Sequence, residues 1–210
     1  MIALDSYLIY LATVLIFFAH PPGPSQLLFV GSALRQGLRP SLPVMAGDLS
    51  ANALQICAAG FGLAGLIALS AGAFGAIKWL GIAYLVWIGV NMIRSASHPA
   101  PRGAPTAAAS FRRGFLTSAA NPYAVVFFAA LFPQFIDPAL TIAPQVAILG
   151  ATYLIIDGVI LLAMGAAATR LVALLGGWAE RWLGIGAGIG LLLAALGLAL
   201  RGDALTGASK

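Results

Sequence analysis

The sequence predicts an all-α integral membrane protein. We expect six transmembrane helices in two inverted three-helix halves, with the first helix of each half interrupted by proline. Three observations lead to this fold. The chain of 210 residues is 61% hydrophobic and 8% charged, whereas soluble domains are about 25% charged. Its apolar residues fall into six blocks, and its basic residues gather in alternate breaks between them. A compact soluble domain of this length cannot bury so much apolar surface.

The apolar blocks set the number of spans, because a helix needs about 20 apolar residues to cross the hydrocarbon core. The blocks cover residues 6–34, 42–69, 74–93, 114–135, 143–169 and 182–200. They leave no room for a separate soluble domain, so residues 1–210 are predicted to form a single transmembrane domain. The proline- and alanine-rich stretch 95–113 is predicted as a loop between a first half, 1–94, and a second half, 114–210.

The basic residues predict the topology. Of 11 lysines and arginines, eight follow the first, third and fifth blocks: Arg35, Arg39, Arg94, Arg102, Arg112, Arg113, Arg170 and Arg181. The positive-inside rule places these breaks in the cytoplasm and both termini outside it, in the periplasm of a bacterial inner membrane. Because each half has three spans, the second half enters the membrane inverted relative to the first. This arrangement is typical of inverted-repeat transporters.

The first block contains Pro21, Pro22, Gly23 and Pro24 within its apolar run. Proline lacks a backbone donor and clashes with the preceding helical turn, so three prolines in four positions predict a broken helix. Two half-helices are expected, with Ser25 near the start of the second. A proline kink in one continuous, tilted helix is the alternative.

The fourth block carries a second helix start at Asn121-Pro122, because Asn is a good N-cap and Pro is favoured at the first helical position. A rise of 1.5 Å per residue puts Asn121 about 12 Å from Arg113, and Pro24 about 16 Å from Arg35. Both breaks then lie near the middle of a core about 30 Å thick. The N-termini of two half-helices can meet there, where their N–H groups and partial positive charges suit a carboxylate. Pro22, Gly23, Pro24, Ser25, Asn121 and Pro122 are therefore predicted to bind substrate.

Asp48 and Asp157 are the acidic residues deep within apolar blocks, one in the middle span of each half. A charge at this depth costs several kcal/mol and normally faces a cavity or a partner. With the half-helix ends, the two carboxylates would complement a zwitterionic amino acid. Asp48 is predicted to bind the substrate ammonium and Asp157 to carry a coupled proton, although the near-symmetry of the halves allows the reverse. The alternative is a pair of structural carboxyl groups, protonated or capped by neighbouring helices.

Other polar residues have two interpretations each. Asn52 and Gln55 follow Asp48 on the same helical face, where they either line the cavity or hydrogen-bond between helices. His20 either relays protons or is a hydrogen-bonded structural group. The last block has small residues at alternate positions, which favour close helix packing within the protomer or in a homodimer: Gly184, Gly186, Gly188 and Gly190.

Several short motifs recur in order along nearly the whole chain. They are His20-Pro21-Pro22-Gly23-Pro24, Gly47-Asp48, Leu80-Gly81-Ile82-Ala83-Tyr84-Leu85 with Gly89, Gly114-Phe115-Leu116, Asn121-Pro122 and Phe132-Pro133-Gln134-Phe135. Together they resemble the LysE/RhtB family of amino-acid exporters. The resemblance implies a bacterial inner-membrane transporter that exports amino acids or related small metabolites, driven by the proton gradient. His20 and Tyr123 depart from the family pattern and point to a different substrate.

Other function classes fit the sequence less well. An intramembrane enzyme using the aspartate pair is the alternative function, but the blocks contain no recognisable nucleophile motif, so no catalytic residue is assigned. Cys57 is the single cysteine, which excludes thiol–disulfide chemistry within the chain. One cysteine and two histidines exclude a zinc site of the Cys/His type, and no metal or cofactor is predicted. The basic residues are scattered between apolar blocks, which excludes nucleic acid as a partner.

Overall fold

The computed structural model describes residues 2–18, 22–62, 71–96, 105–137 and 139–205, and this part of the chain is helical without strands. The all-α prediction is thus confirmed for the described residues. The helices are α1 (Leu4–Phe18), α2 (Pro24–Gln36), α3 (Leu38–Gly60), α5 (Ala71–Ala96), α6 (Ala107–Ala119), α7 (Pro122–Phe135), α8 (Ile142–Leu175) and α9 (Gly177–Leu205).

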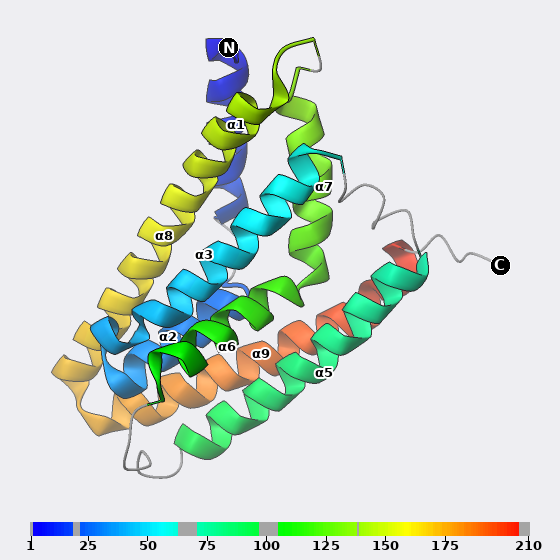
Figure 1. The fold of residues 1–210 in the computed structure, drawn as a ribbon. Helices are drawn as coiled ribbons and strands as arrows, with labels where there is room; N and C mark the ends of the chain where they lie inside the picture. The colour runs from blue at the N-terminus through cyan, green and yellow to red at the C-terminus, as the bar shows by residue number, and fades with distance from the viewer. Residues whose placement is uncertain (1, 19–21, 63–70, 97–104, 138, 206–210) are drawn as a thin grey trace.

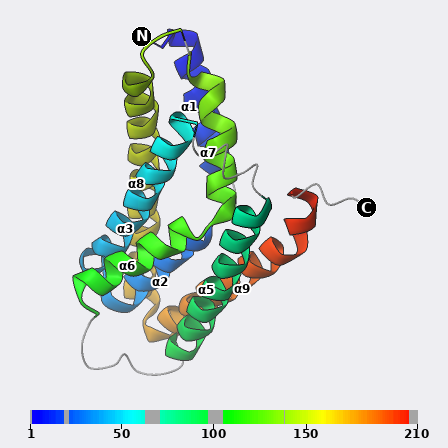
Figure 2. The same cartoon turned by 45° about the vertical axis from the view of Figure 1, so that its right-hand side comes forward.

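The helices pack across the two halves of the chain (Figure 1). Helices α3 and α8 lie side by side, and α5 lies along α9 as a second pair. Helices α1 and α2 contact α8, whereas α6 and α7 contact α3. The helix pairs α1–α2 and α6–α7 therefore each pack against a helix from the other half of the chain. Figure 2 shows α1, α7 and the start of α8 together at one end of the molecule.

The first predicted break coincides with the start of α2. Helix α1 ends at Phe18 and α2 begins at Pro24, with Gly23 as its N-cap. The Gly23 N–H donates to Gln26 Oε1 at 2.9 Å, so the Gln26 side chain caps the helix start. A proline at the first helical position costs no hydrogen bond, which explains the boundary. His20 and Pro21 lie outside the described residues.

The second predicted break separates α6 from α7. Helix α6 ends at Ala119 and α7 begins at Pro122. The axes of residues 107–119 and 124–135 differ by 66°. The Asn121 N–H donates to the Ser118 carbonyl oxygen at 3.0 Å, and the Asn121 carbonyl accepts from the Ala124 N–H at 3.1 Å. The new helix therefore starts at the Asn-Pro pair.

Two breaks in the hydropathy pattern are much shorter in the structure than the sequence predicts. Gly37 (φ 88°) alone joins α2 to α3, and Gly176 (φ 75°) alone joins α8 to α9. Arg170 and Arg181 consequently lie within helices and not in a loop. The predicted loop 95–113 is likewise wrong for its last seven residues, because α6 begins at Ala107 and includes Arg112 and Arg113. Glycine adopts positive φ without a Cβ clash, so one residue can reverse the chain. Helix α8 also extends past its apolar block, through Arg170 to Leu175.

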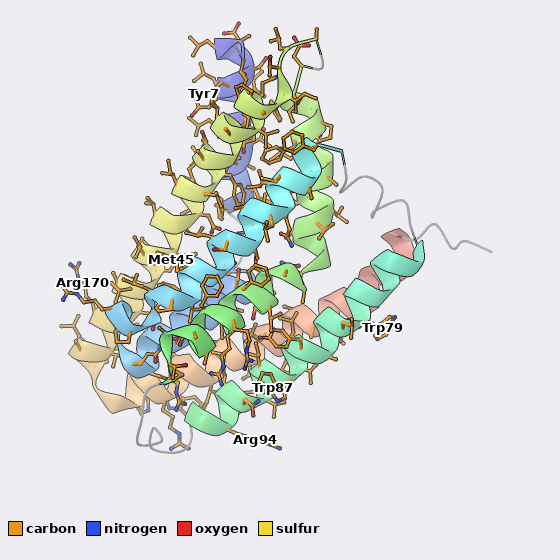
Figure 3. The ribbon with its side chains drawn as sticks, viewed as in Figure 1. Tyr7, Met45, Trp79, Trp87, Arg94 and Arg170 are labelled. Carbon is orange, nitrogen blue, oxygen red and sulfur yellow. The ribbon has the colours of Figure 1, made fainter. Side chains whose placement is uncertain are left out.

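Two of the arginines predicted to be cytoplasmic, Arg94 and Arg170, lie towards the same end of the molecule. Figure 3 places Arg94 and Arg170 at the end with the α2–α3 and α8–α9 turns, away from Tyr7 on α1. Among the described helices, α8 alone is long and apolar enough to cross a membrane, and α6 with α7 meets the same test as a bent pair. Residues of α1, α5 and α9 form shorter apolar helices. Six spans and an inverted repeat stay predictions.

Two apolar clusters form the described core. The first joins α1, α3, α7 and α8 around Tyr10, Phe128, Phe132 and Leu149. The second joins α2, α3, α5, α8 and α9 around Phe29, Leu85, Leu161 and Leu191. Helices α3 and α8 contribute to both clusters, so the stretches of these two helices between the clusters lie in the interior of the molecule.

Candidate functional site

Buried polar residues lie on α3 and α8 between the two apolar clusters. On α3, residues four apart are Val44, Asp48, Asn52 and Ile56, and on α8 they are Leu149, Tyr153, Asp157 and Leu161; all eight are buried. Residues at this spacing share one helical face. The helices run antiparallel, since Gly150 meets Ile56 and Gly158 meets Leu49. The polar residues in the middle of the two sets, Asp48 and Asn52 on α3 and Tyr153 and Asp157 on α8, therefore face each other.

A hydrogen-bond chain connects three helices at this level. Asn52 Nδ2 of α3 donates to Asp157 Oδ2 of α8 at 2.9 Å. Ser118 Oγ of α6 donates to Asn52 Oδ1 at 2.8 Å. The side chains of Asn52, Ser118 and Asp157 are 5%, 3% and 3% exposed. Gln55 Nε2 adds a bond to the Ser118 carbonyl at 3.2 Å. The chain of donors ends on the Asp157 carboxylate.

Asp48 has no such partner. Its side chain is 2% exposed, and neither carboxylate oxygen has a hydrogen-bond partner among the described residues. The side chains of Ser25, Ser118 and Asp157 are its polar neighbours. The Gln55 Oε1 atom is also buried without a partner. All three unpaired buried side-chain atoms in the described part of the chain are therefore acceptors, which favours a ligand that donates hydrogen bonds.

Two glycines bring α6 against α3 and so place Ser118 in the site. A Cβ on Gly47 would overlap the Phe111 carbonyl oxygen, and one on Gly114 would overlap the Val44 carbonyl oxygen. The backbones of α3 and α6 are thus in direct contact on both sides. In the same way, a Cβ on Gly81 of α5 would overlap the Ala120 carbonyl oxygen beside the α6–α7 break. Small residues permit this approach between membrane helices.

An aromatic cluster borders the site towards the end of the molecule that holds α1. Tyr153 lies one turn from Asp157 on α8 and interacts electrostatically with both aspartates. Its ring centroid is 5.3 Å from that of Phe18 on α1 and 4.8 Å from that of Phe128 on α7. The site is therefore polar on its α3 and α6 side and aromatic on its α1 and α7 side.

The family model of the LysE type translocators matches residues 16–202, which is most of the chain. The chain belongs to the LysE type translocator family. The resemblance seen in the sequence motifs is thus confirmed. Two of those motif glycines, Gly47 and Gly114, are the residues that allow this LysE family member to bring α3 and α6 into contact.

Relatives of this translocator include named efflux proteins. An uncharacterized membrane protein of Vibrio cholerae is 38% identical over 79% of this chain and 82% of its own. The homoserine/homoserine lactone efflux protein of Salmonella typhimurium is 32% identical over 72% of this chain and 75% of its own. The leucine efflux protein of an Enterobacter species is 29% identical over 60% of this chain and 61% of its own. No solved structure matches the chain.

The structure of this translocator brings several of the predicted site residues together. Asp48 and Asp157 are neighbours, and Ser25, at the second position of α2, lies beside Asp48. Pro22, Gly23 and Pro24 lead into that helix, whereas Asn121 and Pro122 begin α7. His20 lies outside the described residues. Asn52 is shown to connect helices through its hydrogen bonds to Ser118 and Asp157.

Ser118 is the site residue that the sequence analysis missed. It lies one turn after Gly114 on α6 and three residues before Asn121, so its position between a close helix crossing and a helix break was a usable signal. A serine within an apolar block is common in membrane helices, where it bonds its own backbone or a neighbouring helix. Only the three-dimensional contact with Asn52 distinguishes it.

Proposed function

We propose that this protein exports amino acids and binds the substrate ammonium group at Asp48. The observation that carries this proposal is the set of unpaired acceptors, the two Asp48 carboxylate oxygens and Gln55 Oε1. An alkylammonium group has three donors and no acceptor, so it complements such a set. A buried carboxylate without a partner is costly, and a cationic ligand offsets that cost.

The names of the relatives support recognition through the ammonium group. Two are efflux proteins for homoserine and homoserine lactone or for leucine. These compounds share an α-amino group, whereas the lactone has no free carboxylate. The group that every named substrate offers is therefore the one that Asp48 would bind. These relatives are transporters, so the enzyme alternative is not carried further.

For substrates with a carboxylate, we propose that it binds near the start of α7, at Asn121 and Pro122. A helix N-terminus favours an anion through its N–H groups and partial positive charge. The first turn of α2, with Pro22, Gly23, Pro24 and Ser25, would line the site from the other side. Here the Ser25 side chain faces Asp48, and the Gly23 N–H already donates to Gln26. The Asp48 carboxylate beside Ser25 would repel an anion at the α2 start, so the proposal places the substrate anion at the α7 start.

Proton coupling would follow from the contact between the two aspartates. Two adjacent buried carboxylates repel each other, and a cation or a proton between them relieves that repulsion. We propose that the substrate ammonium occupies Asp48 in one state and that a proton on Asp157 replaces it in the other. The exchange of one positive charge for another gives antiport. His20 stays a candidate for proton relay.

We further propose a bacterial inner-membrane location with both termini periplasmic and the stretch 95–113 cytoplasmic. The shared end of Arg94 and Arg170 (Figure 3) supports this orientation. Single cysteines replacing Ala107 or Ser209 in a Cys57→Ser background would be tested with an impermeant thiol reagent on intact cells. We expect labelling at residue 209 and none at 107. Labelling at 107 alone would contradict the orientation.

The proposed function is tested by counterflow in proteoliposomes. We expect labelled leucine or homoserine to exchange with internal amino acid, and the analogues without the amino group to leave that exchange unchanged. Asp48→Asn should abolish the exchange, whereas Ser50→Ala, whose hydroxyl bonds the Ala46 carbonyl of its own helix, should retain it. Equal competition by the analogues without the amino group would contradict an ammonium site. Absence of transport for a panel of amino acids would contradict the function.

A further inference from the structure

We propose that Asn52 and Ser118 are positioning residues that tie the charge of Asp157 to the geometry of the α6–α7 break. The inference rests on the proposed function for the role of Asp157 as proton carrier. It goes beyond that function by naming how a proton in the site would move a helix. The two residues need not touch the substrate.

The first observation behind this proposal is the direction of the hydrogen bonds made by Asn52. An ionised carboxylate only accepts, so Asn52 must present its NH₂ group to Asp157 and its oxygen to the Ser118 hydroxyl. The observed chain has this order, from Ser118 Oγ to Asn52 Oδ1 and from Asn52 Nδ2 to Asp157 Oδ2. A hydrogen bond to a charged acceptor is about twice as strong as a neutral one. Bonds in a chain also strengthen each other.

The second observation is the position of Ser118 at the break. Ser118 lies in the last turn of α6, and its carbonyl accepts from the Asn121 N–H at 3.0 Å and from Gln55 Nε2 at 3.2 Å. Two residues after Ser118, the carbonyl oxygen of Ala120 lies close to Gly81 of α5. Ser118 therefore contacts the residues leading into α7 through its backbone carbonyl, and it joins the hydrogen-bond chain to Asp157 through its side chain. In the structure, where this chain of hydrogen bonds is intact, the helix axes differ by 66°.

A proton on Asp157 would remove the charge that orders this chain. The bond from Asn52 then becomes a neutral one and holds Ser118 less firmly. The titratable groups facing Asp157 are Asp48 from α3 and Tyr153 from its own helix, and Tyr10 of α1 faces Tyr153. Asp48 would bind the substrate ammonium in one state and lie next to the protonated Asp157 in the other. The break would thus have one geometry with Asp157 charged and a second with it neutral.

The proposal is tested by a spin-label distance across the break. Labels are placed on cysteines replacing Ala108 of α6 and Ala130 of α7, both exposed, in a Cys57→Ser background. Asp157→Asn mimics the neutral acid, and Ser118→Ala removes the hydroxyl. We expect both to shift the distance distribution in the same direction, and the double variant to shift it no further than either one. Ser50→Ala is the matched control and should leave the distribution unchanged.

Transport gives a second readout that a merely structural role would not reproduce. Ser118→Ala should lower uphill efflux relative to exchange by roughly tenfold, the worth of a hydrogen bond in a chain to a charged group. In the Asp157→Asn background, where uphill efflux is expected to be lost already, Ser118→Ala should cause no further loss of efflux, because the effects of coupled sites do not add. If Ser118→Ala does not reach the membrane, Asn52→Leu breaks the same chain and carries the same expectations.

An unchanged distance distribution in Ser118→Ala, or shifts of Ser118→Ala and Asp157→Asn that simply add, would overturn the proposal. The distance measurement needs no transport, so it decides the inference even if no amino acid is exported. Failure of the proposed function would be seen separately, as absence of counterflow in the unmodified protein.

Discussion

Asp48 and Asp157 occupy corresponding places in the two halves of the chain, yet their hydrogen-bond partners differ. Both are buried, both adjoin a glycine, and both fall in the predicted middle span of their half. Asp157 accepts a hydrogen bond from Asn52, whereas Asp48 has no partner among the described residues. Asp157 is therefore part of a hydrogen-bond network, whereas Asp48 has polar neighbours and no hydrogen bond of its own among the described residues.

The difference comes from the neighbours that each helix supplies. One turn after Asp48, α3 carries Asn52, whose amide reaches across to α8 and not back to its own helix. One turn from Asp157, α8 carries Tyr153, whose ring joins the aromatic cluster. Asp48 consequently faces two serines and the other carboxylate. This asymmetry is the basis of the predictions below.

The largest expected effect is on the α2 start that borders Asp48. Replacing Pro21, Pro22 and Pro24 together with alanine should restore a continuous helix and move Ser25 away from Asp48. We expect the protein to reach the membrane and transport to be lost. The measurement is counterflow in proteoliposomes, with the amount of membrane protein as the control. Normal transport in this variant would show that the break is only a kink.

The next effect concerns the ligand itself. Asp48→Asn should weaken amino-acid binding by roughly 100-fold or more, because a desolvated ammonium then lacks its charged partner. Asp157→Asn should weaken binding by less than tenfold, because Asp157 is not the direct partner. Binding of a labelled amino acid to purified protein checks both variants. Equal losses would mean that the two carboxylates share the ammonium.

A smaller effect, on stability, is expected to differ between Gly47 and Gly158, the glycines next to the two aspartates. A Cβ on Gly47 would overlap the backbone of Phe111, whereas one on Gly158 would lie 3.5 Å from Leu49 Cδ1, an ordinary contact. Gly47→Ala should therefore destabilise the protein by about 1–3 kcal/mol, and Gly158→Ala should be neutral or stabilising by up to about 1 kcal/mol. Thermal unfolding in detergent measures both. A Gly47→Ala protein as stable as the unmodified one would contradict the close α3–α6 crossing.

The all-helical fold and the starts of two helices were accessible from the sequence because they depend on local chemistry. Helices α2 and α7 begin at Pro24 and Pro122, and the preference of proline for the first helical position needs no tertiary information. The turns at Gly37 and Gly176 were predicted as longer breaks, because hydropathy marks where apolar residues stop and not where a helix ends. Charged side chains at helix ends hide the true boundary.

The site was accessible only in part. Buried aspartates in apolar blocks stand out at once, because a charge in the membrane is costly. Their contact with each other and the bridge through Asn52 depend on the register between α3 and α8. That register is set by glycine contacts such as Gly150 with Ile56, which no single-chain pattern reveals. Ser118 was missed because its hydrogen bond to Asn52 depends on how α6 packs against α3.

The central claim is that Asp48 binds the substrate and Asp157 carries the coupled proton. It is tested most directly by Asp157→Asn in proteoliposomes, with exchange and uphill efflux driven by a proton gradient measured on one preparation. The account predicts that exchange is retained and that uphill efflux is lost. Uphill efflux equal to that of the unmodified protein would contradict the claim, and so would full activity of the Asp48→Asn, Asp157→Asn double variant.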